Sequence, residues 1–231
     1  MQIIGERGVS GYEPENTLIS FKRALEFGVD RVELDVYVLK TGEVVVIHDS
    51  KVDRTTNGSG YVEDFSLVDL RQLDAGKGEK IPLLVEVIEL VDRKVPIDIE
   101  LKGFGTAGPV AEIIKKYKEK GWLDSDFIVS SFNHVELANF MKLLPSVKTG
   151  ALITGMLTDY AAFAEKLGVD YLIPKSEFLS QEYVDDAHKR GLKVFTFFDG
   201  VDDEAEIKRF KTLGIAGIFS KCPDKARSYL E

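Results

Sequence analysis

The sequence predicts an α/β protein built as a (β/α)8 barrel, or TIM barrel, with a small insertion after the second strand. Short apolar runs alternate with amphipathic stretches along the whole chain, which is the pattern of strands joined by helical crossovers. Glycines follow five of the amphipathic stretches, where a left-handed residue ends a helix. No linker or change of composition divides the 231 residues, so we expect residues 1–231 to form one domain.

Eight apolar runs are the predicted barrel strands. They are four to six residues long, and a helical crossover separates almost every pair, which predicts parallel pairing. The runs are 2–5, 31–36, 96–101, 127–131, 148–153, 171–174, 193–197 and 216–220.

Helical periodicity marks most of the intervening stretches. Ile113, Ile114 and Tyr117, for example, fall on one face of a helix, with lysines between them. The predicted helices are 18–27, 107–120, 135–143, 159–167, 181–190, 203–213 and 225–230.

A ninth candidate strand, 43–47, follows the second strand after the short connection Lys40-Thr41-Gly42. A parallel crossover needs about a dozen residues or more, so this run should pair antiparallel with an extension of the second strand. Residues 37–80 are therefore predicted to form an insertion on the C-terminal face of the barrel, where barrel enzymes build their active sites.

Composition excludes several classes of partner. The net charge of −9 argues against nucleic acid and against stable association with an anionic membrane. No apolar stretch is long enough to cross a bilayer. Cys222 is the single cysteine and has no internal disulfide partner, which fits a reducing compartment. We expect a cytoplasmic protein.

Paired carboxylates on the second strand are the strongest functional signal. Glu33 and Asp35 lie between apolar residues and are two apart, so a strand directs both to one face. Two buried like charges are costly unless a positive group neutralises them, and divalent cations bind carboxylate oxygens readily. Glu100 ends the third strand and would lie beside them. The three acids together suit Mg²⁺ or Ca²⁺.

Basic groups and a histidine should surround these acids. Arg7 follows the first strand, and Lys102 follows the third. Cations beside a metal site favour an anionic substrate, and the guanidinium group fits phosphate. His48, on the inserted hairpin, is a candidate general acid or base at the same mouth. Simple ion pairs between strand ends are the alternative explanation for Arg7 and Lys102.

Several motifs make the chain resemble the glycerophosphodiester phosphodiesterase family over nearly its whole length. Each motif is short, and the specificity comes from their order and spacing. The motifs are Gly5-Glu6-Arg7-Gly8, Pro14-Glu15-Asn16-Thr17, Glu33-Leu34-Asp35, His48-Asp49, Arg54-Thr55-Thr56, Glu100-Leu101-Lys102, Ser130-Ser131-Phe132 and residues 214–220 with Pro223.

The resemblance implies a TIM barrel that hydrolyses glycerophosphodiesters to glycerol 3-phosphate and an alcohol, using a divalent cation. It also assigns roles to individual positions. Glu33, Asp35 and Glu100 would be metal ligands, Arg7 and Lys102 would contact the phosphate, and His48 would be one of two acid/base groups.

The second acid/base position departs from the family pattern, which has a histidine before Arg-Gly where this chain has Glu6. Beside Arg7 and a bound cation, a glutamate should be ionised and a poor proton donor. It remains a candidate base or an additional metal ligand. Without a cation, the neighbouring acids should raise its pKa, and Glu6 could then carry a proton.

The distal half departs as well. The family pattern has Trp-Thr on the penultimate strand, whereas this chain has Phe195-Thr196, so Phe195 is predicted to pack against the glycerol moiety. Lys221 occupies a position where the pattern has an acid. It is interpreted either as a solvated loop lysine or as an additional anion contact.

The leading hypothesis is a metal-dependent glycerophosphodiester phosphodiesterase whose substrate is a small anionic phosphodiester. Loss of one histidine with retention of the other groups also fits a catalytically impaired barrel that binds phosphodiesters or metal. A lyase that releases a cyclic phosphate, as in relatives of the family, is a third hypothesis.

Overall fold

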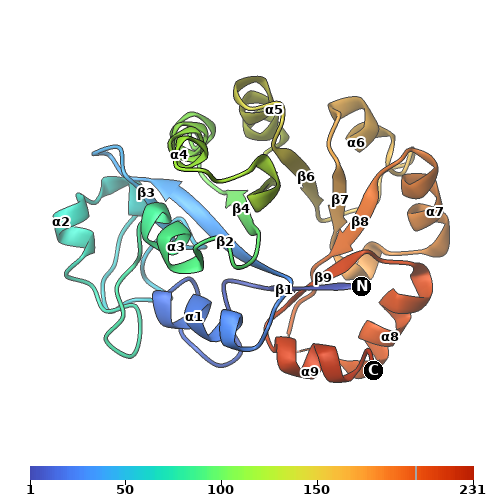
Figure 1. Cartoon of the computed structure of the whole chain (residues 1–231), viewed down its shortest axis with the longest axis horizontal. Coiled ribbons are helices and arrows are strands. Elements are labelled where there is room, and N and C mark those ends of the chain that lie inside the picture. Colours follow the sequence, from blue (N-terminus) through green and yellow to red (C-terminus); the bar gives the residue numbers. More distant parts are fainter. Residues whose placement is uncertain (201) are drawn as a thin grey trace.

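Eight parallel strands close into a barrel in the computed structural model, which describes residues 1–200 and 202–231. The strands follow the chain order around the barrel, and β9 pairs with β1 to close it. This architecture confirms the predicted TIM barrel (Figure 1). The barrel strands are β1 Gln2–Gly5, β2 Arg31–Val38, β4 Ile97–Leu101, β5 Phe127–Ser131, β6 Lys148–Ile153, β7 Tyr171–Pro174, β8 Lys193–Thr196 and β9 Gly217–Ser220.

Helices surround the strands on the outside of the barrel, as Figure 1 shows. They are α1 Leu18–Glu26, α3 Leu84–Val91, α4 Ala107–Glu119, α5 His134–Leu143, α6 Ala162–Leu167, α7 Gln181–Lys189, α8 Glu204–Leu213 and α9 Pro223–Ser228. Two short 3₁₀ helices, η2 Asp124–Asp126 and η3 Ser176–Phe178, lie in connections between them.

Helix α3 is the barrel helix that the sequence analysis did not predict. Its sequence, LVEVIELV, is rich in β-branched residues, which favour strands. The helical signal is nevertheless present, because the buried residues Leu84, Val87, Ile88 and Val91 recur at helical spacing.

An antiparallel strand, β3 Val44–Val46, pairs with the end of β2, so that Val36 faces Val46. The predicted hairpin is therefore present. The following segment contains η1 Val62–Asp64 and α2 Leu67–Leu70, and it extends to one side of the barrel in Figure 1. It packs around its own apolar cluster, formed by Leu39, Val45, Ile47, Val52, Val62, Leu70, Ala75 and Ile81. The boundaries 37–80 remain a prediction.

Two apolar layers support the barrel. The larger lies between the strands and the surrounding helices. A smaller cluster is formed by Ile4, Ile128, Leu152, Tyr171, Ile173, Phe195 and Phe219, which come from six different barrel strands. Charged residues gather above this cluster, at the carboxyl-terminal side of β1, β2 and β4, and form a polar mouth. No helix in the described part of the chain is long and apolar enough to span a membrane.

Candidate active site

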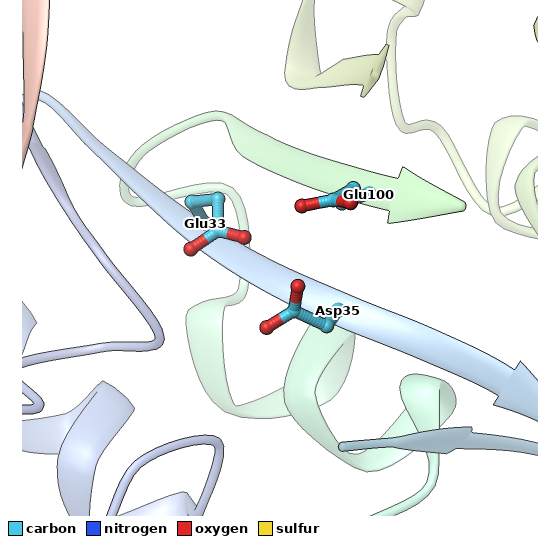
Figure 2. Close-up of side chains that lie close together, drawn as sticks. All are labelled: Glu33, Asp35 and Glu100. Carbon is cyan, nitrogen blue, oxygen red and sulfur yellow. The ribbon is translucent and has the colours of Figure 1, made fainter. Parts of the chain in front are cut away.

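Three buried carboxylates meet at the carboxyl ends of β2 and β4. Glu33 and Asp35 project from one face of β2, and the parallel register places Asp35 opposite Glu100 of β4. Figure 2 shows the three side chains directed toward a common space. One oxygen from each of the three carboxylates lies within 4.8 Å of the others. The residues are only 4%, 1% and 7% exposed, respectively, so water provides little compensation for their charges.

The electrostatics of this acidic triad suit a divalent cation. Burial and the charge of Asp35 raise the pKa values of both Glu33 and Glu100. Asp35 Oδ1 is buried and accepts no hydrogen bond. A hard cation would supply the missing charge and take these oxygens as ligands, so the residues present fit Mg²⁺ or Ca²⁺.

Arg7 is bound on several sides at the edge of the triad. Its backbone N–H donates to Glu33 Oε2 at 2.8 Å, and its Nε lies 3.4 Å from Asp35 Oδ2. Its Nη1 donates to Glu15 Oε1 at 3.0 Å. The backbone of Arg7 has a positive φ of 51°, which is costly for a residue with a side chain. The tight turn between β1 and α1 imposes this conformation and directs the guanidinium toward the acids.

Lys102 contacts two of the three carboxylates of the triad. Its ammonium is 2.8 Å from Glu100 Oε1 and 3.7 Å from Asp35 Oδ1. Burial opposes its charge, but the two carboxylates outweigh burial and raise the pKa of Lys102. Two cations therefore stand beside the acids, and both remain charged at neutral pH.

His48 is oriented by hydrogen bonds at both ring nitrogens. Nδ1 lies 2.6 Å from Asp49 Oδ1, and Nε2 lies 3.3 Å from Lys102 Nζ. A lysine ammonium only donates, so Nε2 is the acceptor and Nδ1 carries the proton toward Asp49. Burial lowers the pKa of His48, and Lys102 and Arg7 lower it further. The ring is thus neutral, with a basic nitrogen at the mouth.

Arg54 links the histidine to the arginine through two acids. It donates to Asp49 Oδ2 at 2.7 Å and to Glu15 Oε1 at 2.7 Å, and Glu15 in turn holds Arg7. Arg54 was not among the predicted site residues. Its appearance in one of the motifs shared with the family was the available signal.

Asn16 is a second residue of the site that was not among the predicted site residues. Its Nδ2 donates to Asp35 Oδ2 at 2.8 Å, and its backbone has a positive φ of 57°. This amide fixes one oxygen of Asp35 and leaves the other free. The signal was again its position within a shared motif.

Glu6 lines the same cavity as the triad, His48 and Arg7. Burial raises the pKa of Glu6 to about 7, whereas Arg7 and Lys221 oppose the rise. From the sequence, such a rise is expected to come from the neighbouring acids. In the structure burial is the larger cause, because the Glu6 side chain is almost fully buried.

Apolar side chains form the other wall of the cavity. They are Phe132, Leu152, Phe197 and Phe219. Phe195, the predicted glycerol contact, does not line this cavity, since it packs deeper in the barrel against Tyr171, with ring centroids 5.0 Å apart. Phe197, which directly follows β8, lines the cavity instead, one layer nearer the mouth than Phe195.

Comparisons with known proteins identify one family. A model of the glycerophosphoryl diester phosphodiesterase family matches residues 7–225. A glycerophosphodiester phosphodiesterase from Caldanaerobacter subterraneus subsp. tengcongensis is 39% identical, over 96% of this chain and 94% of the relative. A second, from Bacillus altitudinis, is 36% identical, over 97% and 96%.

A solved structure shows the same fold. An Oleispira antarctica phosphodiesterase, in complex with the product sn-glycerol-3-phosphate, superposes with a TM-score of 0.91. It is 30% identical, and the superposition covers 100% of this chain and 96% of that one. The match of the family model and the identity to full-length relatives establish that this chain belongs to the glycerophosphoryl diester phosphodiesterase family.

Proposed function

We propose that the protein hydrolyses glycerophosphodiesters to glycerol 3-phosphate and an alcohol, with a divalent cation, Mg²⁺ or Ca²⁺, held by Glu33, Asp35 and Glu100. The observation that carries the proposal is the buried acidic triad between two cations, at the polar mouth of a barrel of this family. When bound, the cation supplies positive charge to a phosphoryl oxygen.

Arg7 and Lys102 are proposed to bind the phosphate. Both are charged, and both lie within 3.7 Å of Asp35, so a phosphodiester placed on the triad would lie close to both cations. Fixed cations stabilise the charge that develops on phosphoryl oxygens in the transition state, because they need no reorganisation. Glu15 and Arg54 keep Arg7 in place.

His48 is proposed as one acid/base group. Its neutral ring presents Nε2 to the cavity, while Asp49 holds Nδ1–H. It can accept the proton of an attacking hydroxyl group or water, and the imidazolium so formed can return that proton. Lys102 sits beside Nε2 and restrains it in the ground state.

Glu6 is proposed as the second acid/base group: one of the two groups acts on the attacking oxygen and the other on the leaving oxygen. Without a cation, burial raises the pKa of Glu6 to about 7, and a cation held by the triad would lower it and favour the carboxylate, so we assign Glu6 the role of a base. The glycerol moiety would lie on the apolar wall, against Phe132 and Phe197. Phe195 then supports this wall from below.

Turnover of glycerophosphocholine and glycerophosphoethanolamine tests the proposal. Purified protein is assayed with Mg²⁺, Ca²⁺, Mn²⁺ or chelator, beside a His48→Ala control. Cation-dependent release of glycerol 3-phosphate that the control loses is the expected result. Release of a cyclic phosphate would identify a lyase instead, and binding without turnover would identify an impaired barrel.

Lysophospholipids are a second candidate substrate class, which exposed apolar residues at the mouth favour. Phe104, which is 89% exposed, follows β4, and Met156 and Leu157 follow β6. Between them, Phe132 both lines the cavity and reaches the surface. An acyl chain could continue along this rim. Phe104→Ser with Leu157→Ser should then lower turnover of lysophosphatidylcholine but not of glycerophosphocholine, whereas Leu123→Ser, on a distant loop, should change neither.

The physiological setting is proposed from composition alone. A net charge of −9 favours a small-molecule substrate over nucleic acid, and a single buried Cys222 fits a cytoplasmic location.

A further inference from the structure

Two residues at which the chain departs from the family pattern face each other across the barrel closure. Strands β1 and β9 pair in parallel, with Gly5 opposite Ser220, so the residues that follow, Glu6 and Lys221, leave their strands together. The backbone N–H of Glu6 donates to Ser220 O at 2.9 Å. Lys221 Nζ lies 4.0 Å from Glu6 Oε1.

Hydrogen bonds hold the backbone at and around Lys221 in place, which restricts where its side chain can reach. Its carbonyl accepts the Gly11 N–H at 3.0 Å, which ties it to the segment after β1. On either side of it, Ser220 Oγ and the Cys222 N–H both donate to the carboxylate of Asp202. These contacts fix the end of β9, from which the Lys221 side chain reaches toward Glu6.

Two cations lie near Glu6, and Arg7 is shared with other carboxylates whereas Lys221 is not. Arg7 Nη2 lies 3.7 Å from Glu6, but Arg7 also serves Glu15 at 3.0 Å and Asp35 at 3.4 Å. Within residues 1–200 and 202–231, by contrast, Glu6 is the only carboxylate within 4.0 Å of the Lys221 ammonium. Glu6 Oε2 is buried and accepts no hydrogen bond, so water does little to fix this carboxylate.

We propose that Lys221 is a positioning residue for catalysis: its ammonium holds the Glu6 carboxylate at the cavity wall, in the orientation in which Glu6 exchanges a proton with the substrate. The inference rests on the proposed function of Glu6. It explains the two departures together, because a glutamate at position 6 requires a positive neighbour where a histidine does not.

A double-mutant cycle tests the pairing. Lys221→Met should lower kcat about tenfold and change KM less than about threefold, and Lys221→Arg should restore most of the loss. In a Glu6→Gln background, Lys221→Met should change kcat less than about twofold, because no carboxylate remains to be held. Lys175→Met is the matched control, since Lys175 pairs with Glu177 and Asp199 at the same end of the barrel and should not affect kcat.

A tenfold loss in both backgrounds, or a loss that appears mainly in KM, would overturn the proposal, because Lys221 would then act on the substrate directly. An unchanged kcat in Lys221→Met would overturn it as well. A ¹³C NMR titration of the Glu6 carboxyl group separates this question from turnover. Its midpoint should rise in Lys221→Met and stay unchanged in Lys175→Met, with Arg7, Asp35 and Asp202 present throughout. Wild-type protein without turnover would refute the proposed function, and the titration would still decide the pairing.

Discussion

Replacing Glu33 by glutamine should stabilise the metal-free protein while it impairs the site. Glu33 is 4% exposed, and its oxygen lies within 4.8 Å of oxygens of Asp35 and Glu100. Two unit charges at that separation repel by about 3 kcal/mol at an effective dielectric constant near 20. Glutamine removes the charge but keeps an oxygen for the Arg7 N–H. Since the attraction of Arg7 offsets part of the repulsion, we expect the free energy of unfolding to rise by about 1–3 kcal/mol at pH 7.

The pH dependence of this gain has a definite sign. Burial and Asp35 raise the folded pKa of Glu33 above its ordinary value of 4.5, so the folded protein binds this proton more tightly than the unfolded chain. Wild-type stability therefore falls as the pH rises from 4.5 through the folded pKa. At pH 7 this effect can lower the free energy of unfolding by at most about 3 kcal/mol, because the pH lies about 2.5 units above the ordinary pKa of 4.5. The advantage of the glutamine variant should be small at pH 5 and larger at pH 8.

Urea unfolding in chelator at pH 5, 7 and 8 measures the effect, and thermal unfolding should show a shift of about 2–4 °C per kcal/mol for a chain of this size. Added Ca²⁺ or Mg²⁺ should stabilise the wild type more than the variant. Glu112→Gln, on the exposed face of α4, is the control and should change little. A variant less stable than the wild type in chelator at pH 7, or a gain independent of pH, would refute the electrostatic reasoning.

Three further predictions follow from the contacts described. His48→Ala should lower kcat by about 10²–10⁴ with an unchanged circular dichroism spectrum, and near-normal turnover would exclude His48 as the acid/base group. Arg54→Ala should lower kcat/KM about three- to tenfold in steady-state assays, because Glu15 and Asp49 lose their common partner; an unchanged value would make that link irrelevant to catalysis. The double variant Glu6→His with Lys221→Asp should have a higher kcat than Glu6→His alone. Equal kcat values of the single and double variants would argue against coupling of the two positions.

Local sequence was sufficient for most of the barrel. The predicted bounds of β1, β5, β6 and β7 coincide with those in the structure, because each strand is a short buried run between polar connections. The short Lys40-Thr41-Gly42 connection likewise predicted the antiparallel β3. Helix α3 was missed because its β-branched residues have strand propensity, and packing against the barrel overrides that propensity.

The depth at which a side chain lies inside the barrel was harder to predict than the face to which it points. The period-2 alternation of a strand directs Phe195 and the residue two positions later, Phe197, to the same face, but it does not say which of the two reaches the cavity. That depends on how far β8 rises relative to its neighbours. The structure places Phe197 at the mouth and Phe195 among the interior side chains.

The sequence by itself determined which residues share a face: Glu33 with Asp35, and Glu100 with Lys102, because side chains two apart on a strand point the same way. Tertiary structure decided which faces meet. Only the parallel register of β2 with β4 sets Asp35 beside Glu100, and only closure of β9 on β1 brings Lys221 to Glu6. These contacts join segments far apart in the chain, so they arise from barrel closure and strand register rather than from local propensity.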